Sequence, residues 1–562
     1  MPTPIECDLL VVGSGAAGLS AAVTAAHHGL RVVVAEREPV FGGTTAWSGG
    51  WMWTPCNPLA QRAGIVEDVA QPREYLRNVL GSHFDERRVN AFLDAAPRMV
   101  AFFESHTALA FESGTTIPDT YGTLPGAGTG GRSVIAAPYD ARALGDLVAR
   151  LREPLRETTF HGLTIQAGPD LRAFMNVTRS PRALAYVAGR VAKHVVDLAI
   201  HGRAMQLRNG LALVARLLRS AADRSVELRC DARASRLLPV DGRVHGAVLA
   251  TRNGEIEVRA RRGVVLASGG FPHDDARRRA TFPAPDQHWA LAVPSAAGDG
   301  ARLAESVGGI FDSSLASPGA WCPISLVPYA DGSVGRFPHI IERGKPGIIA
   351  VLASGRRFCN EGNGYHDYVE AMLRAVPDGD EVASWLVCTR AFQRRYGLGV
   401  SRPSPLPVAP FLRSGYLKTG RTIAELARNC GIDPQGLTDA IAEYNAHAKH
   451  GEDPLFGRGT TIYNRYQGDA RVTPNPCVAP IERPPYFAVK VVPGSFGTFA
   501  GIRTDEHARV VDVRGDPIPG LYAAGTDMAS VMGGYYPAGG INLGPAMTFG
   551  YIAGCHAAGQ SG

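Results

Sequence analysis

The sequence predicts an α/β fold built around a Rossmann-like, nucleotide-binding parallel sheet. A short apolar strand at residues 8–12 runs directly into a glycine-rich turn at 13–18, and an alanine-rich helix follows. A second strand at 31–35 ends at an acidic residue, and two further apolar segments, 262–268 and 520–525, end in small residues. Apolar strands that alternate with helical segments in this way are typical of doubly wound α/β sheets.

The composition supports a large buried core and excludes several functions. Of the 562 residues, 45% are hydrophobic and 20% are charged, and the formal net charge is +6. Such a chain is too apolar for disorder, and without runs of lysine and arginine it does not predict a nucleic-acid surface. The 66 glycines are gathered in clusters and show no three-residue period, which excludes collagen. Clustered glycines indicate that the backbone must approach another group closely.

The sequence predicts neither a membrane span nor a metal site. The most apolar long segment, 183–200, is interrupted by Arg190, Lys193, His194 and Asp197, so we expect an amphipathic helix there, with peripheral membrane contact left open. The nine cysteines form no C-x-x-C pair, which argues against zinc and against a disulfide framework. Because the first strand leaves no room for a signal peptide, we expect a reduced, cytoplasmic setting.

The turn at 13–18 has the Gly-x-Gly-x-x-Gly spacing of dinucleotide-binding folds. Gly13 is expected to form the tight turn, Gly15 to admit a pyrophosphate, and Gly18 to let helix and strand pack closely. The N-terminus of the following helix offers free N–H groups to the phosphates. Glu36 ends the second strand, where a carboxylate hydrogen-bonds ribose hydroxyls and disfavours NADP. The motif alone leaves NAD and FAD open.

Glycine-rich segments farther along the chain favour FAD. Residues 41–50 form a second glycine loop, which an isoalloxazine ring needs and an NAD site does not. The strand at 520–525 is followed by Asp527, which is placed to bind a ribityl hydroxyl. Residues 539–544 then lead into a helix that begins at Pro545, a residue suited to a first helical position. The N-terminus of that helix is expected to stabilise an anionic reduced flavin.

These glycine features, taken in order, resemble the FAD-binding fumarate reductase/succinate dehydrogenase flavoprotein superfamily over essentially the whole chain. Within it, the chain resembles the 3-ketosteroid Δ1-dehydrogenases in three stretches. They are residues 119–122 with the glycine-rich 125–132, residues 355–361 followed by Tyr365, and residues 529–549. The third stretch contains Met-Gly-Gly-Tyr-Tyr-Pro-Ala-Gly-Gly and is the most specific of the three.

The resemblance implies an FAD-binding domain made from residues 1–271 and 486–562, with a catalytic domain, residues 272–485, inserted between its strands. It implies FAD as the cofactor. The residues expected to hold it are Gly13, Ser14, Gly15, Ala16, Ala17, Gly18, Glu36, Arg37, Gly42, Gly43, Thr44, Thr45, Ser48, Gly49, Ala267, Ser268, Gly269, Gly525, Asp527, Asn542 and Leu543. Succinate dehydrogenases attach FAD through a histidine in the second glycine loop. This chain has none there, so we expect non-covalent FAD.

The resemblance also implies the desaturation of a small apolar cyclic ketone, foremost the 1,2-dehydrogenation of a 3-ketosteroid with hydride transfer to the flavin N5. Tyr536 matches the tyrosine that hydrogen-bonds the ketone oxygen, and the Gly540 N–H matches the backbone donor beside it, so the two form an oxyanion hole. Tyr365 matches the base that removes the α-proton, and Tyr121 the tyrosine that supports this base. A free phenol has a pKa near 10, so such a base needs support.

Three alternative functions stay open. A fumarate-type reductase needs an arginine just before the paired glycines, and residues 535–538 are Tyr-Tyr-Pro-Ala, which disfavours it. A Δ4-ketosteroid or cyclohexanone-type dehydrogenase is not excluded, because Gly539 stands where the Δ1 enzymes usually carry a second proline. A flavin-binding protein without catalysis is disfavoured by the full tyrosine set. The electron acceptor (quinone, oxygen or a carrier protein) stays open.

Residues near the predicted tyrosines are assigned mainly structural roles. Asn360 and Glu361 are expected to be structural hydrogen-bonding groups, and His366, beside Tyr365, is expected to be exposed. Residues 457–473 have the composition of a loop. The apolar helical stripe at 211–221 is expected to be mainly core, with a cavity-lining role as the alternative.

Overall fold

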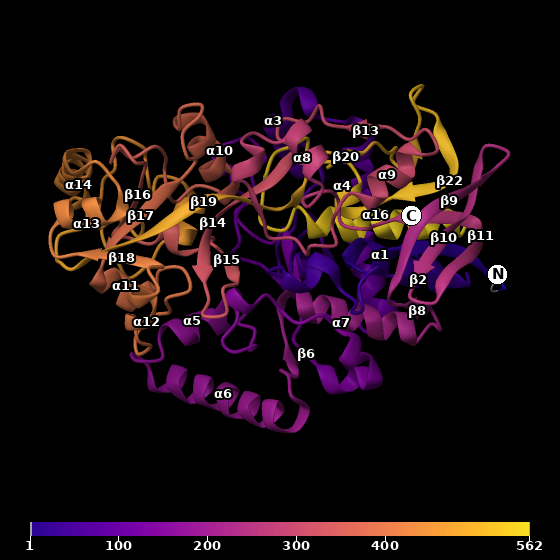
Figure 1. The fold of residues 1–562 in the computed structure, drawn as a ribbon, viewed down its shortest axis with the longest axis horizontal. Helices are drawn as coiled ribbons and strands as arrows, with labels where there is room; N and C mark the ends of the chain where they lie inside the picture. Colours follow the sequence, from indigo (N-terminus) through magenta and orange to yellow (C-terminus); the bar gives the residue numbers. More distant parts are fainter. Residues whose placement is uncertain (1–2, 561–562) are drawn as a thin grey trace.

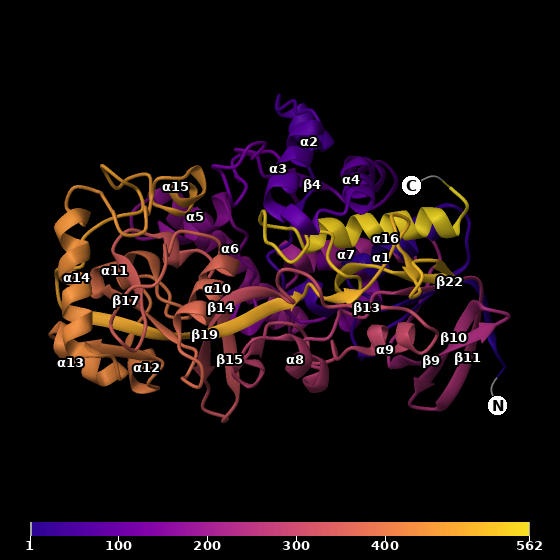
Figure 2. The same cartoon turned by 90° about the horizontal axis from the view of Figure 1, so that it is seen from above.

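The structure, a computed structural model, describes residues 3–560. The molecule is elongated, with one large sheet toward each end (Figures 1 and 2). The first sheet follows the order β21-β22-β11-β1-β2-β8, and β10 and β9 continue antiparallel beside β11. Its strands are β1 (Ile5–Val12), β2 (Val32–Ala35), β8 (Glu227–Arg229), β9 (Ala232–Val240), β10 (Arg243–Thr251), β11 (Gly254–Leu266), β21 (Arg509–Val511) and β22 (Pro517–Ala523).

The four strands predicted from apolar runs are confirmed as the parallel centre of this sheet. β1 pairs in parallel with β2 and β11, and β11 pairs in parallel with β22. The last four residues of β1 and of β11, and all of β2, are buried. Parallel strands are covered on both faces, which is why these segments appear in the sequence as continuous apolar runs.

Helices α1 (Ala16–His27) and α16 (Leu543–Ala557) pack against each other, although they come from opposite ends of the chain (Figure 2). The close approach depends on glycine: a Cβ at Gly550 would lie 2.4 Å from the Ala17 carbonyl oxygen, and one at Gly554 would lie 2.7 Å from that of Ala21. The alanine-rich sequence of α1 presents no large side chain to its partner. Segments from both halves of the expected FAD-binding domain are therefore in contact, as the predicted discontinuous domain requires.

The second sheet is antiparallel and follows the order β15-β14-β19-β17-β16, with β12 and β18 also pairing with β19. Its strands are β12 (Trp289–Ala290), β14 (Gly319–Pro328), β15 (Val334–Pro338), β16 (Ile348–Val351), β17 (Ser384–Thr389), β18 (Leu417–Gly420) and β19 (Tyr486–Thr498). β19 is the central strand of this sheet, so residues 486–498 pair with the inserted part of the chain. The expected boundary at 485 therefore cuts this sheet, and its strands continue to Thr498.

The remaining elements cover the sheets or connect them. β3 (Trp51–Trp53), β5 (Ser133–Ala136) and β4 (Phe111–Ser113) form a small antiparallel sheet, β6 (Tyr139–Asp140) pairs with β7 (Gln206–Leu207), and β13 (Phe311–Asp312) pairs with β20 (Gly501–Ile502). The helices are α2 (Pro58–Arg62), α3 (Ala70–Leu80), α4 (Glu86–His106), α5 (Pro169–Met175), α6 (Pro181–His201), α7 (Asn209–Ala222), α8 (Asp275–Thr281), α9 (Asp299–Glu305), α10 (Tyr365–Ala375), α11 (Arg390–Tyr396), α12 (Ala409–Arg413), α13 (Ile423–Cys430), α14 (Pro434–Ala448) and α15 (Ile462–Gln467).

The helices include parts of two segments, 211–221 and 457–473, for which the sequence makes a prediction. α7 contributes its apolar residues to the main core, as expected for 211–221. The segment 457–473 is not loop throughout, because it contains α15, which begins at the side-chain cap of Thr461. Among residues 3–560, no helix combines the length and the apolar character that a bilayer crossing requires.

A buried ionic network stabilises the second domain beside β16. Glu361 accepts a hydrogen bond from the Ala350 N–H, two from Arg357 at 2.8 and 2.9 Å, and one from Arg458 at 3.1 Å. Arg357 also pairs with Asp453 at 2.7 Å. Burial alone would raise the pKa of Glu361, but Arg357 and Arg458 outweigh it and lower the pKa. The structural role expected for Glu361 is confirmed.

Replacing Glu361 by glutamine is expected to lower the free energy of unfolding by about 3–5 kcal/mol, because two buried guanidinium groups lose their shared carboxylate. A urea titration followed by circular dichroism measures this change. The control is Glu104→Gln, which removes the exposed ion pair with Arg62 and should lower the free energy of unfolding by less than about 1 kcal/mol. Because the folded pKa of Glu361 is lowered, the difference is present at pH 7 and is lost as the pH falls through that folded value. Equal losses for the two variants would contradict this role.

Candidate active site

A cavity of about 1570 Å³ begins at the carboxyl ends of β1, β2 and β11 and extends toward the second domain. Ligands of doubly wound sheets bind at this edge. The predicted residues that line the cavity are Gly13, Ser14, Gly15, Ala16, Ala17, Glu36, Arg37, Gly43, Thr44, Thr45, Ser48, Gly49, Ala267, Ser268, Gly269, Tyr365, Gly525, Tyr536, Gly540, Asn542 and Leu543. Gly18, Gly42, Asp527 and Tyr121 do not line it.

The first glycine turn leaves the N-terminus of α1 open to the cavity. Gly15 is the N-cap of α1 and provides no capping side chain, while the Ala16 N–H donates to Thr45 Oγ1 at 3.0 Å. The Glu36 carboxylate accepts hydrogen bonds from the N–H and the hydroxyl of Ser14, at 3.1 and 2.5 Å. The turn, the second glycine loop and the end of β2 are therefore joined by hydrogen bonds into one surface with free helical N–H groups.

Two glycines that do not line the cavity hold this surface in shape. A Cβ at Gly18 would lie 2.0 Å from the Gly13 carbonyl oxygen, so only glycine permits this packing of helix against strand. Gly42 has φ +119°, and its N–H donates to Ser14 Oγ at 2.9 Å. Their contribution to a nucleotide site is therefore indirect.

Asp527 is hydrogen-bonded within the protein. Its buried carboxylate accepts a hydrogen bond from the Gly270 N–H at 2.9 Å and one from Ser268 Oγ at 2.8 Å. It does not face the cavity. Asp527 therefore holds the loop that follows β11 and positions the backbone of Ser268 and Gly269, while its contact with a ribityl hydroxyl stays a prediction.

Two of the predicted tyrosines meet at the cavity wall. The ring centroids of Tyr365 and Tyr536 are 4.8 Å apart, with the planes at 74°, and Phe496 packs on Tyr365 at 5.4 Å. Asn542 Nδ2 donates to the Tyr536 hydroxyl oxygen at 3.2 Å. Burial raises the pKa of Tyr365 well above the ordinary value of 10, and Tyr536 raises it further. Burial also raises the pKa of Tyr536, and Tyr365 offsets part of that increase.

The N-terminus of α16 presents backbone donors to the same part of the cavity. The Gly540 carbonyl accepts from the N–H groups of Trp53 and Gly544, whereas the Gly540 N–H donates to no other residue among those described. Asn542, the N-cap of α16, provides no side-chain cap. Gly540 and Tyr536 thus supply a backbone N–H and a phenol O–H at one cavity wall, which is the pair of donors that an oxyanion hole needs.

Tyr121 lies away from this pair. Its hydroxyl donates to Asp367 Oδ1 at 2.8 Å, and no hydrogen bond joins it to Tyr365 among the described residues. Asp367 and Tyr365 both belong to the first turn of α10. Burial, and then the Asp367 charge, raise the pKa of Tyr121. The contact with Asp367 joins the loop that carries Tyr121 to the helix that carries Tyr365. Among the described residues, the expected hydrogen bond between the two tyrosine hydroxyls is not present.

The expectation that His366 is exposed is wrong. Only 1% of its surface is exposed, and its Nδ1 accepts a hydrogen bond from the Trp321 N–H at 3.1 Å. Its Nε2 lies 3.2 Å from Glu370 Oε1, and its ring centroid is 5.9 Å from that of Tyr536. The side chain is buried because α10 packs against β14, and this packing was not visible in the local sequence.

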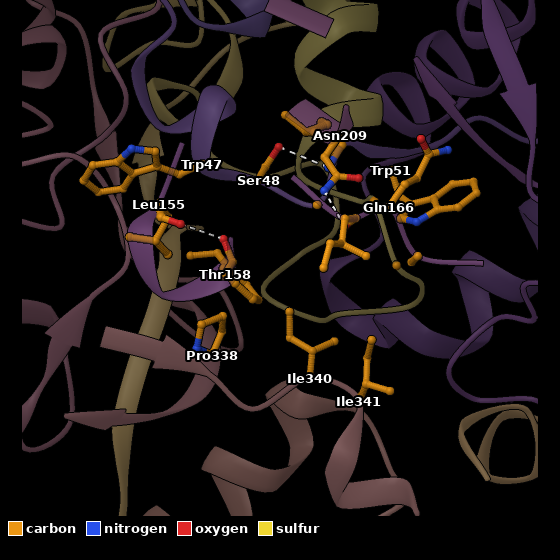
Figure 3. Close-up of a pocket in the computed structure, with 18 of the residues that line it drawn as sticks. Trp47, Ser48, Trp51, Leu155, Thr158, Gln166, Asn209, Pro338, Ile340 and Ile341 are labelled. Atoms are coloured by element: carbon orange, nitrogen blue, oxygen red, sulfur yellow. Dashed lines mark hydrogen bonds between the residues drawn. The ribbon is translucent and has the colours of Figure 1, made fainter. Parts of the chain in front are cut away.

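Beyond the tyrosines, the cavity is bounded by apolar side chains from both parts of the chain (Figure 3). Ile340 and Ile341 from the second domain face Ser48, Trp51 and Asn209 across the open space. The hydroxyl of Thr158 donates to the Leu155 carbonyl, so this segment directs few free polar groups into the cavity. The cavity, at about 1570 Å³, is larger than the common range of about 300–1,000 Å³ for small-molecule pockets.

Comparisons with known proteins match this geometry. The FAD binding domain family matches residues 8–543. The chain is 40% identical over 557 residues to 4-oxocyclohex-2-ene-1-carboxylate 5-dehydrogenase of Sinomonas cyclohexanicum, covering 98% of this chain and 93% of that protein. It is 35% identical over 570 residues to 3-oxosteroid 1-dehydrogenase of Mycobacterium tuberculosis, covering 99% of each. The chain belongs to the FAD-binding flavoprotein family.

A solved structure gives the same assignment for the flavoprotein. The 3-ketosteroid Δ1-dehydrogenase from Sterolibacterium denitrificans, in complex with 1,4-androstadiene-3,17-dione, superposes with a TM-score of 0.91 at 34% identity and 99% coverage of both chains. The flavoprotein is thus an FAD-dependent dehydrogenase of the oxocyclohexene and 3-oxosteroid dehydrogenase type. Its glycine turns and open helix N-termini fit this cofactor, because they line one continuous groove with backbone donors free for phosphates.

FAD is expected to be released when the flavoprotein is denatured. No histidine or cysteine is among the described residues that line the cavity, and Thr44, Thr45 and Ala46 stand in the second glycine loop. Acid precipitation followed by the absorbance spectrum of the supernatant tests this. Yellow colour that stays with the washed pellet would contradict it, and a mixture of apoprotein and added FAD serves as the control for trapped cofactor.

Sequence reasoning missed one residue of this site and one contact of another. Tyr463 of α15 lines the cavity, but it lies outside every motif, in a segment interpreted as loop. Asn542 lines the cavity as predicted for a cofactor-binding residue, and its amide also donates to the Tyr536 hydroxyl. The spacing of six residues between Tyr536 and Asn542, across a glycine-rich turn, was the available signal for that contact.

Proposed function

We propose that this flavoprotein desaturates a cyclic ketone next to its carbonyl group, and that the foremost substrate is a 3-ketosteroid oxidised between C1 and C2. The observation that carries the proposal is that Tyr536 and Gly540 both line a large, mainly apolar cavity, and that the Gly540 N–H has no partner among the described residues. The similarity to 3-oxosteroid 1-dehydrogenases over 99% of the chain supports the same reaction.

In the proposed mechanism, the phenol of Tyr536 and the N–H of Gly540 donate hydrogen bonds to the ketone oxygen. These bonds stabilise the negative charge that develops on this oxygen as the α-proton leaves. The phenolate form of Tyr365, whose ring contacts Tyr536, accepts that proton from the α-carbon and becomes a neutral phenol. The raised pKa of Tyr536 keeps its phenol protonated and able to donate. When bound, FAD supplies the acceptor for the hydride that leaves the β-carbon.

A second candidate substrate is an oxocyclohexanecarboxylate. The relative from Sinomonas cyclohexanicum that is named for such a compound is 40% identical to this chain. The cavity wall also contains cationic groups, among them Arg172, Lys345, Arg402 and Arg471, that a substrate carboxylate could reach. Asp469 and Glu342 are the acidic residues on the same part of the wall, and Asp469 is already shared by Arg395 and Arg471.

The two candidates are separated by anaerobic reduction of the bound flavin. We expect loss of the visible flavin absorbance with a saturated or 4-ene 3-ketosteroid, slower or no loss with 4-oxocyclohexanecarboxylate, and none with succinate. The reverse order would assign the carboxylate substrate. A flavin that none of these compounds bleaches would remove the desaturase proposal as a whole, and dithionite reduction provides the control that the flavin is reducible.

The reaction rate is expected to increase with pH through the alkaline range. Burial raises the pKa of Tyr365 above 10, so its basic form is scarce at neutral pH and becomes more abundant as the pH increases. The chemical step, measured by stopped-flow flavin reduction at saturating ketone, should therefore show no plateau below pH 10. The variant Tyr365→Phe should lose this dependence while retaining bound FAD. A plateau at neutral pH would indicate another base.

A further inference from the structure

The segment 536–540, which we call the donor segment, carries both proposed donors to the ketone oxygen and is held from outside the cavity. Its Pro537 carbonyl accepts hydrogen bonds from the Thr120 N–H at 2.8 Å and from the Tyr75 hydroxyl at 2.6 Å. Neither Thr120 nor Tyr75 lines the cavity. Tyr75 lies in α3, which Figure 2 shows beside the chain that leads into α16. An earlier part of the chain therefore fixes the first end of the donor segment.

The other end of the donor segment is fixed in a similar way. The Gly540 carbonyl accepts a hydrogen bond from the Trp53 N–H at 3.0 Å. The Trp53 side chain is fully buried, and its indole N–H donates to Asp119 Oδ1 at 2.9 Å. Asp119 directly precedes Thr120, whose N–H holds the first end. The carboxylate of Asp119 therefore links the two anchors of the donor segment.

Asp119 is buried among further hydrogen-bond donors. Only 1% of its surface is exposed. Its Oδ2 accepts from the Gly128 N–H at 2.8 Å and pairs with Arg132. The Arg132 guanidinium also donates to Glu67 Oε1 at 2.8 Å and lies 5.8 Å from the centre of the Tyr75 ring. The carboxylate cannot move without breaking several buried hydrogen bonds, so the link between the two anchors is rigid.

The same cluster accounts for the glycine-rich segment 125–132, none of whose residues lines the cavity. A Cβ at Gly126 would lie 2.4 Å from the Gln71 carbonyl oxygen, and one at Gly128 would lie 2.7 Å from Arg132 Nε. Glycine at these two positions lets the loop close around the buried ion pair. The segment therefore acts at a distance from the cavity, through the residues that it encloses.

We propose that Asp119 and Tyr75 are positioning residues, which hold the Tyr536 phenol and the Gly540 N–H at the spacing that one ketone oxygen requires. The proposal rests on the proposed function, because that function gives the two donors their role. Donors stabilise the developing charge most when they are fixed in place before the reaction. Tyr536 directly precedes Pro537, so a shift of the Pro537 carbonyl also shifts the phenol.

The variant Tyr75→Phe tests this role at the first anchor, because it keeps the buried ring and loses the hydroxyl that donates to Pro537. The substrate is the ketone that reduces the bound flavin fastest. We expect kcat to fall roughly tenfold, since the displacement of a catalytic group by a fraction of an ångström has an effect of this order. The KM should change by less than about threefold, because the apolar contacts of the ketone remain.

The control is Tyr522→Phe, which also removes a buried tyrosine hydroxyl from the FAD-binding part of the chain. The Tyr522 hydroxyl contacts His556 Nδ1 at 3.0 Å, and neither residue lines the cavity. Tyr75→Phe and Tyr522→Phe should each lower the Tm by a few degrees, because each loses one buried hydrogen bond. Only Tyr75→Phe should lower kcat, so a loss of stability by itself does not account for the effect.

A double-mutant cycle separates positioning from an independent structural effect. If Tyr75 acts through the Tyr536 phenol, Tyr75→Phe should slow the Tyr536→Phe variant by less than about twofold, whereas two independent losses would multiply. A further tenfold loss in the Tyr536→Phe variant overturns the proposal, and so does a Tyr75→Phe variant with the kcat of the wild type. A wild type whose flavin no ketone reduces would remove the proposed function, and this assignment with it.

The variant Asp119→Asn tests the link between the anchors, and Arg132 keeps Glu67 as its ionic partner there. We expect kcat to fall at least as far as in Tyr75→Phe, because both anchors lose their connection, while FAD stays bound. If Asp119→Asn yields no flavoprotein, Trp53→Phe tests the same link, because it removes the indole N–H and leaves the ion pair intact. A wild-type kcat in whichever of these variants retains FAD overturns the role of Asp119.

Discussion

Replacing Tyr536 by phenylalanine is expected to lower kcat by about 10²–10³-fold while FAD stays bound. The substitution removes one of the two donors at the ketone oxygen, and a single donor of an oxyanion hole is worth this much in rate. The ring itself remains, so its packing against Tyr365 and Phe499 is preserved. Steady-state turnover measures kcat, with the ketone that reduces the bound flavin fastest as the substrate. The flavin absorbance of the purified variant measures how much FAD it retains.

The neighbouring tyrosine provides the control for this prediction. Tyr535 does not line the cavity, and its ring lies beside His83 at 6.2 Å. The variant Tyr535→Phe should therefore keep kcat within about threefold of the wild type, as expected for a group outside the transition-state contacts. If Tyr535→Phe caused the larger loss, the ketone oxygen would have to bind on the other side of the Tyr535–Tyr536 pair.

Replacing Gly540 by alanine is expected to abolish most activity for a different reason. Gly540 has φ +104°, and a Cβ there would lie 2.7 Å from the Trp53 nitrogen and 2.8 Å from the Trp51 carbonyl carbon and oxygen. The added methyl group must displace the turn from β3, which moves the N–H that faces the cavity. Because a displacement of about 1 Å in a catalytic group costs on the order of 10²-fold, we expect a loss of at least that size in kcat/KM.

The adjacent glycine is the matched control for this substitution. A Cβ at Gly539 would meet no atom within 4 Å, and Gly539 does not have a positive φ. Gly539→Ala should fold normally, bind FAD and keep most of its activity. Thermal unfolding monitored by flavin fluorescence should show a lower Tm for Gly540→Ala alone. Equal behaviour of the two variants would show that the backbone at Gly540 does not hold the reacting ketone.

The parts of the fold that could be predicted are those in which residues close together in the sequence also make the contacts that determine the structure. β1, the turn at Gly13 and α1 follow one another within the chain, and each glycine has a nearby steric reason. The same holds for Tyr536 and Gly540, which belong to one short motif beside the start of α16. In these segments the pattern and the structure depend on the same few residues.

The parts that could not be predicted depend on contacts between distant segments. β19 is central to the second sheet because it pairs with β14 and β17, and no local feature distinguishes it from the strands of the first sheet. His366 is buried by β14, and Tyr121 contacts Asp367 across 246 positions. Asp527 faces the loop after β11 rather than the cavity, because the N–H groups of that loop attract its carboxylate.

The packing of α16 against α1 has a consequence for how the protein is made. Tyr536, Gly540 and the N-terminus of α16 are synthesised more than 500 residues after the glycine turn at Gly13. A nascent chain that has not reached residue 536 therefore has an incomplete groove, with one side of α1 uncovered. We therefore expect cofactor loading to follow the synthesis of α16, and a chain that terminates before residue 536 to yield colourless protein even where the second domain has folded.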